Sequence, residues 1–184
     1  FRADPDVPLG VPEVNGALLE ARPGLGASPN CTTAGLVMAV APLARAAGLR
    51  ALRLATYQAV SGAGSRAVEE LRQGSRAVLD GKSAAAFAFP RPIPFDCLPH
   101  CDAFDAEGWS AEERKLERET RKILALPGLA VSATAVRVPV ERGHALAAWI
   151  ATDRPLHPDE ARAILAAAPG VAVEDDPAAA RYPT

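Results

Sequence analysis

The sequence lacks three features that would each indicate a specialised class of protein. Its formal net charge is only −2, which provides no electrostatic field for nucleic acid or for an anionic membrane surface. The longest apolar stretches, such as Ala34 to Ala44, are too short to cross a bilayer, and no signal-peptide pattern is present. Its three cysteines, Cys31, Cys97 and Cys101, suit a reducing compartment better than a disulfide framework. The sequence therefore predicts a cytoplasmic protein that binds neither nucleic acid nor membrane.

The length and composition of the chain are typical of one globular domain. The 184 residues are 49% hydrophobic and 23% charged, with only 5% aromatic residues, so the chain can bury a core that offsets its conformational entropy. It begins with Phe1 and has no initiator Met at that position, which we take as a sign that it is part of a longer polypeptide.

The first third of the chain changes from an irregular segment to a helix. Residues 1–30 carry five of the 17 prolines, and we expect little regular structure there beyond a short helix near Gly16–Ala21 and a brief strand at Leu25–Ala27. The apolar run from Thr32 to Ala47 predicts a buried helix that ends at Gly48, with Cys31 in its first turn.

The middle of the chain alternates between predicted strand and predicted helix. The stretch from Arg50 to Val60 alternates as a strand does, and the periodicity from Gly64 to Asp80 is that of an amphipathic helix. Four prolines between Phe87 and Phe104 predict an extended segment. Ser110 and Glu113 have the spacing of a capping box, which predicts a helix that continues to Pro127-Gly128.

The last third carries two more strands and a helix. Strands are predicted over 129–140 and 145–152, with a turn at Glu141–His144 between them. Pro158 opens a final helix, and a short strand at Val171–Val173 follows it. Strands broken by helices without regular βαβ spacing predict an α+β domain.

Cys31 is the most informative single position. A thiol in the first turn of a helix faces unpaired backbone amides and the positive end of the helix dipole, and both favour the nucleophilic thiolate. A buried structural cysteine is the alternative, but the polar, turn-like setting Ser28-Pro29-Asn30-Cys31-Thr32-Thr33 is a poor place for an inert side chain.

Two residues near the third predicted strand are candidates for a site. His144 follows Gly143 in a tight turn, where an imidazole can exchange protons near neutral pH, although a solvated loop histidine would look the same. Arg137 lies in an apolar strand and needs an anionic partner, which is either a substrate carboxylate or an internal glutamate. His157 precedes a helix start, where a surface role is expected.

Two further motifs are incomplete. Cys97-Leu98-Pro99-His100-Cys101 lacks the second ligand pair of a structural zinc site, so no metal is predicted. Ser61-Gly62-Ala63-Gly64-Ser65-Arg66-Ala67 fits the outline of a dinucleotide-binding turn, but the proline-rich segment stands where the next parallel strand would have to be.

Taken together, four motifs in a fixed order resemble aspartate-β-semialdehyde dehydrogenase. They are Ser28–Thr33, Thr56–Gly64, Glu112–Lys115 with Glu119–Leu124, and Arg137–Val140 through Gly143-His144. The similarity runs from Asp6-Val7-Pro8-Leu9 to about Thr152. It implies an α+β fold with a mixed, largely antiparallel sheet flanked by helices, similar to the C-terminal domain of glyceraldehyde-3-phosphate dehydrogenase-like proteins.

The resemblance implies an NADP-dependent oxidoreductase that converts β-aspartyl phosphate into aspartate β-semialdehyde through a cysteine thioester, in lysine, methionine and threonine biosynthesis. The implied roles are Cys31 as nucleophile, His144 as acid/base catalyst, Gln58 orienting the covalent intermediate, Arg137 clamping the substrate carboxylate, Glu112 meeting the ammonium group, Lys115 and Asn30 binding substrate and phosphate, and Ser61, Gly62, Ala63 and Gly64 lying beside the nicotinamide. Glu112 and Lys115 are three residues apart and would share one face of a helix.

The resemblance also implies an organisation. Residues 1–184 correspond to a catalytic and dimerisation domain, whereas the Rossmann domain that binds most of NADP, including a further phosphate-binding arginine, would precede Phe1. The expected partners are a second copy of the chain, in a homodimer or higher homo-oligomer, and the small-molecule substrate and phosphate. The sequence departs from the family where Thr32 replaces a common Ser and where Cys101 replaces an aliphatic residue near the expected subunit interface.

Two alternatives stay open. The related N-acetyl-γ-glutamyl-phosphate reductase uses the same thioester chemistry, but Glu112 argues against it because an N-acetylated substrate has no ammonium group. A non-catalytic oligomerisation domain could retain the fold, but the presence of Cys31, Gln58, Arg137 and His144 argues against that reading.

Overall fold

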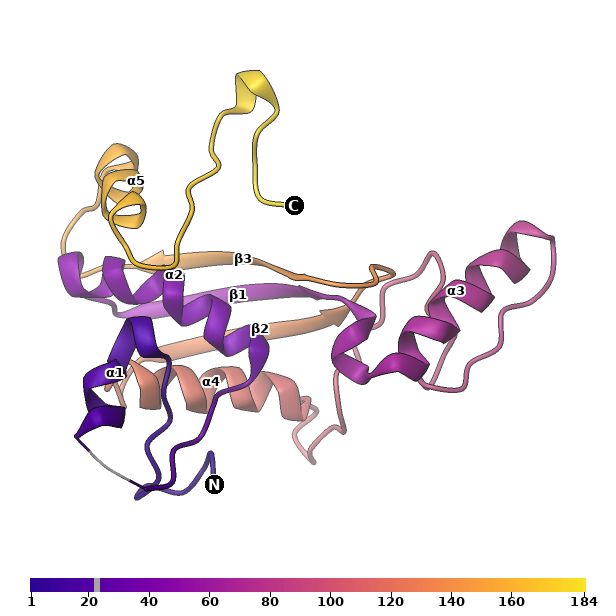
Figure 1. Cartoon of the computed structure of the whole chain (residues 1–184), viewed down its shortest axis with the longest axis horizontal. Coiled ribbons are helices and arrows are strands. Elements are labelled where there is room, and N and C mark those ends of the chain that lie inside the picture. The colour runs from indigo at the N-terminus through magenta and orange to yellow at the C-terminus, as the bar shows by residue number, and fades with distance from the viewer. Residues whose placement is uncertain (22–23) are drawn as a thin grey trace. The chain divides into compact units, whose positions relative to one another are not determined.

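The computed structural model describes residues 1–21 and 24–184 (Figure 1). Residues 22 and 23, which belong to the predicted irregular segment, lie outside the described residues. The elements are α1 (Pro12–Glu20), α2 (Cys31–Ala47), β1 (Ala51–Gln58), η1 (Val60–Ala63), α3 (Ser65–Leu79), α4 (Ala111–Ile123), β2 (Ala130–Arg137), β3 (His144–Ala151), α5 (Pro158–Ala166) and η2 (Pro177–Ala179).

The three strands form one mixed sheet in the order β2-β1-β3. The amide of Ala130 donates to the carbonyl of Arg50, and the amide of Val138 donates to the carbonyl of Gln58 at 3.0 Å, so β1 and β2 run in parallel. The amide of Arg50 donates to the carbonyl of Ala151 at 2.8 Å at the opposite end of β3, which makes that pairing antiparallel. The predicted α+β fold with a mixed sheet is confirmed.

The residue contacts divide the chain into two compact units. Unit 1 comprises Phe1–Arg53, Arg114–Ser132 and Ala148–Thr184, and unit 2 comprises Leu54–Glu113 and Ala133–Ala147. Each unit has a hydrophobic cluster of its own. The buried members are Leu9, Val11, Val37 and Ile123 in unit 1 and Val60, Ala67, Leu71, Ile93 and Leu98 in unit 2.

In unit 1, α1 and α5 both pack against α2. The sequence defines both ends of α2: Asn30 is the N-cap, and Gly48 ends the helix with a φ of 72°. A Cβ at Gly48 would lie 2.0 Å from a carboxylate oxygen of Asp153. This position therefore needs glycine both for its backbone conformation and for the close approach of that side chain.

In unit 2, α3 packs against η1 and anchors the start of the proline-rich segment. Glu70 on α3 is fully buried, and one of its carboxylate oxygens accepts hydrogen bonds from the amides of Phe87, Ala88 and Phe89. These amides lie in a segment without helix or strand partners, so the carboxylate satisfies them instead. As predicted, residues 87–104 contain no helix, but bends at 87–91 and a turn at 94–95 interrupt the expected extended path.

The capping box at the start of α4 is also confirmed. The Ser110 Oγ accepts from the amide of Glu113 at 3.3 Å, and the carboxylate of Glu113 accepts from the amide of Ser110 at 2.8 Å. The second oxygen of Glu113 accepts from the amide of Ala135 at 3.0 Å, which ties the helix start to β2 within unit 2.

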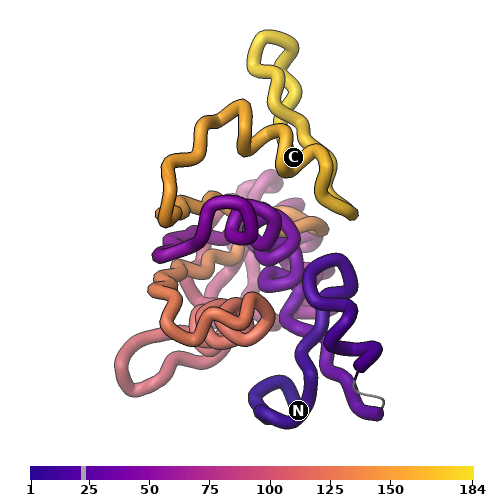
Figure 2. Tube along the Cα trace, turned by 90° about the vertical axis from the view of Figure 1, so that its left-hand side faces the viewer, coloured from indigo at the N-terminus to yellow at the C-terminus, as the bar shows by residue number. Residues whose placement is uncertain are grey.

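Three predictions near the chain ends need correction. The first helix begins at Pro12 rather than near Gly16, because the side chain of Asn15 bonds to the amide of Val11 and the carbonyl of Leu9 and so closes the first turn. The predicted strand at Leu25–Ala27 is reduced to a single parallel bridge between Ala27 and Leu9. The predicted strand at Val171–Val173 is absent: this stretch belongs to the arm that follows α5 (Figure 2), where no described strand pairs with it.

Candidate functional site

One peptide group in unit 2 holds two of the predicted site residues. Ala59 follows β1 and is fully buried. Its amide donates to Nδ1 of His144 at 3.1 Å, and its carbonyl accepts from Nη1 of Arg137 at 2.8 Å. The backbone of Ala59 therefore fixes the orientation of both side chains at once.

This contact also determines which nitrogen of His144 carries the proton. Because Nδ1 accepts a hydrogen bond, the neutral imidazole holds its proton at Nε2. A Cβ at Gly62 would lie 3.4 Å from this Nε2 and 3.2 Å from Nη1 of Arg137. Gly62 thus lets η1 pack closely against both side chains, and the exchangeable proton of His144 lies beside this loop.

Arg137 lies at the end of β2 with 8% of its surface exposed. Beyond the bond to Ala59, its guanidinium lies 5.8 Å from the ring centre of Phe89, and its buried Nε has no hydrogen-bond partner among the described atoms. A buried guanidinium donor without a partner is costly, and a planar carboxylate is the group that best matches its geometry.

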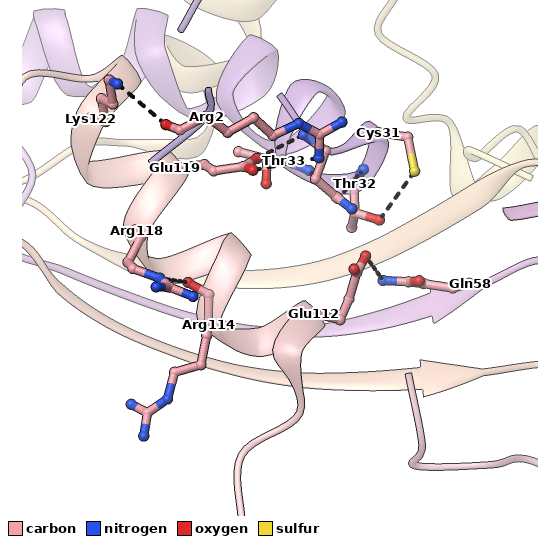
Figure 3. A network of polar contacts seen from close by, with 11 residues as sticks. Arg2, Cys31, Thr32, Thr33, Gln58, Glu112, Arg114, Arg118, Glu119 and Lys122 are labelled. Carbon is pink, nitrogen blue, oxygen red and sulfur yellow. Dashed lines mark hydrogen bonds and ion pairs between the residues drawn. The ribbon is translucent and has the colours of Figure 1, made fainter. Parts of the chain in front are cut away.

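Gln58 and Glu112 form the next part of the group. The side-chain amide of Gln58, at the end of β1, donates to a carboxylate oxygen of Glu112, near the start of α4, at 3.0 Å (Figure 3). Both side chains are buried. A hydrogen bond to a buried carboxylate holds the Gln58 amide in one orientation.

Cys101 lies within unit 2, and its side chain is buried there. Burial raises the pKa of its thiol to about 11, and the carboxylate of Glu112 adds to this shift, whereas the charge of Arg137 opposes it. Cys101 is therefore a protonated, structural thiol at neutral pH.

In unit 1, Cys31 is the first residue of α2 and is exposed. The side chain of Asn30 accepts from the amides of Thr32 at 2.8 Å and Thr33 at 3.3 Å, which satisfies two of the unpaired amides at this helix end. The Sγ of Cys31 lies 3.9 Å from Oγ1 of Thr32 (Figure 3). The predicted thiol in the first turn of this helix is confirmed.

Unit 1 also contains a basic pocket. This cavity of about 320 Å³ is lined by Arg2, Ala3, Lys115, Arg118, Glu119 and Lys122. Its lining residues comprise four cationic ones and one carboxylate, and this net positive charge favours an anion. The resemblance predicts that Lys115 binds phosphate, but no sequence pattern indicates that Arg2 lines the same pocket, because the two residues are far apart along the chain.

The predicted residues thus fall into two sets. Unit 2 brings together Gln58, Glu112, Arg137, His144 and the Ser61–Gly64 segment, and unit 1 contains Asn30, Cys31 and Lys115. The remaining histidines have other surroundings: the ring of His100 contacts that of Phe104 at a tilt of 44°, with ring centres 4.6 Å apart, and His157 caps α5. Within residues 1–21 and 24–184, no group of three or more His, Cys, Asp or Glu side chains could hold a metal ion.

None of the described helices has the length and apolar content needed to cross a membrane.

Sequence reasoning missed Ala59 and Arg2. Ala59 acts only through its peptide group, which leaves no trace in a side-chain pattern. Arg2 stands in a loop, and only the folding of that loop onto α4 reveals its place.

An α+β domain with these two sets of residues falls within the semialdehyde dehydrogenases. Residues 40–184 match the family described as "Semialdehyde dehydrogenase, dimerisation domain", and the chain belongs to this family.

Relatives and solved structures agree with this assignment. The chain is 44% identical to aspartate-semialdehyde dehydrogenase of Aquifex aeolicus over all of its own length and 55% of that protein. It is similar to the crystal structure of aspartate semialdehyde dehydrogenase II from Vibrio cholerae complexed with ASA, with a TM-score of 0.88 and 38% identity over 92% of this chain and 51% of that one. A more distant structure, aspartate semialdehyde dehydrogenase with NADP from Candida albicans, has a TM-score of 0.59 and 26% identity over 90% of this chain and 46% of that one. The chain thus spans about half the length of the relatives it matches.

Proposed function

We propose that this chain is the catalytic and dimerisation part of an NADP-dependent aspartate-semialdehyde dehydrogenase. The observation that carries the proposal is the peptide group of Ala59, which holds the expected acid/base His144 and the expected carboxylate clamp Arg137 together in a chain of this family. The reaction is the reductive dephosphorylation of β-aspartyl phosphate to aspartate β-semialdehyde, a step towards lysine, methionine and threonine.

Cys31 is the nucleophile of the proposed reaction. Its Sγ attacks the acyl carbon, and the bond from that carbon to the phosphate oxygen breaks. Phosphate departs, and a thioester remains on Cys31. An exposed thiol at the start of a 17-residue helix suits this role, because the helix dipole stabilises the attacking thiolate.

Arg137, Glu112 and Gln58 orient the substrate. The buried Nε of Arg137, which has no hydrogen-bond partner among the described atoms, gives the guanidinium a donor for the α-carboxylate. The carboxylate of Glu112 attracts the substrate ammonium group, and the Gln58 amide that it holds at 3.0 Å orients the covalent intermediate.

The basic pocket of unit 1 holds the phosphate. Lys115 and Arg2 both line it, and Asn30 contributes to substrate binding next to Cys31. A pocket with four cationic side chains and one carboxylate can stabilise both the bound phosphoryl group and the departing phosphate.

NADP fits the segment Ser61-Gly62-Ala63-Gly64. Gly62 places this segment next to His144 and Arg137, and Gly64 has a φ of 93° with no atom near its missing Cβ, so the backbone at Gly64 is open to a flat ring. NADPH, when bound, supplies the hydride that reduces the thioester carbonyl. His144 supplies or accepts the exchangeable proton at Nε2 as the carbon–sulfur bond breaks and the aldehyde leaves.

The chain is further proposed to form a homodimer or higher homo-oligomer in the cytoplasm. The family to which it belongs is defined as a dimerisation domain, which supports this assembly.

The proposal can be tested with the full-length gene product in the reverse direction, by following NADPH formation from aspartate semialdehyde, phosphate and NADP. We expect phosphate-dependent turnover, a loss of about a thousandfold in kcat for Cys31→Ser, and little change for Cys97→Ser, since Cys97 is an exposed thiol with no assigned role. Turnover of N-acetylglutamate semialdehyde in place of aspartate semialdehyde would favour the related reductase. Absence of turnover with both would favour a non-catalytic oligomerisation domain.

A further inference from the structure

Glu119 is a buried carboxylate in unit 1 with two different partners. Only 5% of its surface is exposed. Its Oε2 accepts a hydrogen bond from the amide of Asn30 at 2.7 Å, and its Oε1 lies 3.7 Å from Nη1 of Arg2 (Figure 3). Glu119 itself lies on α4. One side chain thus joins three segments that are far apart along the chain.

The first partner, Asn30, precedes the proposed nucleophile. Its side chain caps α2 by accepting from the amides of Thr32 and Thr33, and its own amide is bound by Glu119. The backbone on the N-terminal side of Cys31 is therefore held both by its cap and by a charge-assisted hydrogen bond.

The second partner, Arg2, lines the basic pocket. The backbone of its segment is held by Lys122, whose Nζ donates to the carbonyls of Arg2 at 3.2 Å, Val7 at 2.9 Å and Asp4. The Arg2 side chain is half exposed, and its 3.7 Å distance from Glu119 is longer than a hydrogen bond. Glu119 therefore orients the guanidinium by charge while leaving its donors for a ligand.

We propose that Glu119 is a positioning residue that aligns the phosphate-binding Arg2 and the backbone of the nucleophile Cys31 through two separate oxygens of one carboxylate. The inference rests on the proposed function, since it gives these two residues their roles. Although Glu119 also lines the basic pocket, its proposed role is indirect: it acts through Arg2 on phosphate affinity and through Asn30 on the reactivity of Cys31.

Two substitutions separate the two actions. Glu119→Gln keeps an oxygen that can accept from the amide of Asn30 but removes the negative charge that faces Arg2. Glu119→Ala removes both. Glu117→Gln is the matched control, because it makes the same change two positions away on α4, where the side chain pairs with Arg121 at 2.8 Å and is more exposed.

The test measures kcat and the KM for phosphate in the reverse reaction of the full-length gene product. For Glu119→Gln we expect the KM for phosphate to rise about tenfold with a smaller change in kcat, because the effect passes through Arg2. For Glu119→Ala we expect a similar rise in KM together with a fall of about tenfold or more in kcat. Glu117→Gln should match the wild type in both constants.

A double-mutant cycle with Arg2→Met makes the test independent of general damage to the fold. If Glu119 acts on phosphate through Arg2, Glu119→Gln should raise the KM for phosphate only in the presence of Arg2, and the two substitutions should not add. Should Glu119→Ala fail to fold, this cycle and the Gln variant still decide the question.

The outcomes distinguish the inference from the function on which it rests. Equal effects of Glu119→Gln on KM with and without Arg2, or a loss confined to kcat, would overturn the positioning role while leaving the enzyme active. A wild type that does not turn over aspartate semialdehyde would overturn the proposed function, and the positioning role with it.

Discussion

Raising the pH should destabilise the chain through one buried thiol. Burial raises the pKa of Cys101 from 9.0 to about 11 in the folded state. Between these values the unfolded chain loses a proton that the folded chain keeps, so ionisation favours unfolding. The contribution of Cys101 to stability is therefore fully present below a pH of about 9 and is lost as the pH rises towards about 11.

The size of the effect follows from the shift. A raised pKa of about 11 against 9.0 corresponds to a total loss of about 3 kcal/mol, of which about 2 kcal/mol is lost by a pH of about 10.5. Since a domain of this size has a free energy of unfolding of about 5–15 kcal/mol, this loss is large enough to measure.

The assay is urea unfolding followed by far-ultraviolet circular dichroism, at a pH of about 8 and about 10.5. Cys101→Ala removes the titration, and its packing cost is the same at both pH values. Other groups ionise alike in both proteins, so the wild type should lose about 2 kcal/mol more than this variant between the two conditions. Cys97→Ala, at an exposed position, should behave as the wild type does. An equal loss in wild type and Cys101→Ala would refute the reasoning.

Three further predictions concern stability and reactivity. Glu70→Ala should lower the free energy of unfolding by about 3 kcal/mol, because it leaves three loop amides without their hydrogen-bond acceptor. Glu69→Ala, on the exposed side of the same helix, should change the free energy of unfolding little. Comparable urea midpoints for the two variants would contradict this prediction. Gly48→Ala should lower the free energy of unfolding by about 3 kcal/mol, since the new side chain combines a φ of 72° with a Cβ placed 2.0 Å from the Asp153 carboxylate. An unchanged melting temperature would contradict this prediction. Iodoacetamide at neutral pH should modify the exposed Cys31 well before the buried Cys101. If peptide mass mapping finds both cysteines modified at the same rate, the burial of Cys101 is contradicted.

Local signals explain the elements that the sequence predicted correctly. The N-cap Asn30 and the terminating Gly48 bound α2, and Ser110 with Glu113 begins α4, in each case through contacts between residues at most four positions apart. Such contacts depend little on the rest of the fold. The strand predicted at Val171–Val173 failed for the complementary reason, because a strand requires a partner that its own residues do not specify.

The candidate site shows the same difference between what local sequence signals indicate and what only contacts between distant segments create. Residue types and motif order were enough to single out Cys31, Gln58, Arg137 and His144. Nothing in the sequence indicated that the peptide of Ala59 holds two of these side chains, because a backbone contact leaves no side-chain pattern. The basic pocket was equally hidden, since Arg2 and Lys115 are brought together only when the first residues fold onto α4.

By itself, the sequence determined where most helices and strands lie, which residue types carry chemistry and to which family they point, because caps, glycine turns and hydrophobic periodicity act over a few residues. Only the tertiary structure decided the raised pKa of Cys101, the tautomer of His144 and the two contacts of Glu119. Each of these depends on burial or on a hydrogen bond between distant segments, and such contacts exist only once the chain has closed on itself.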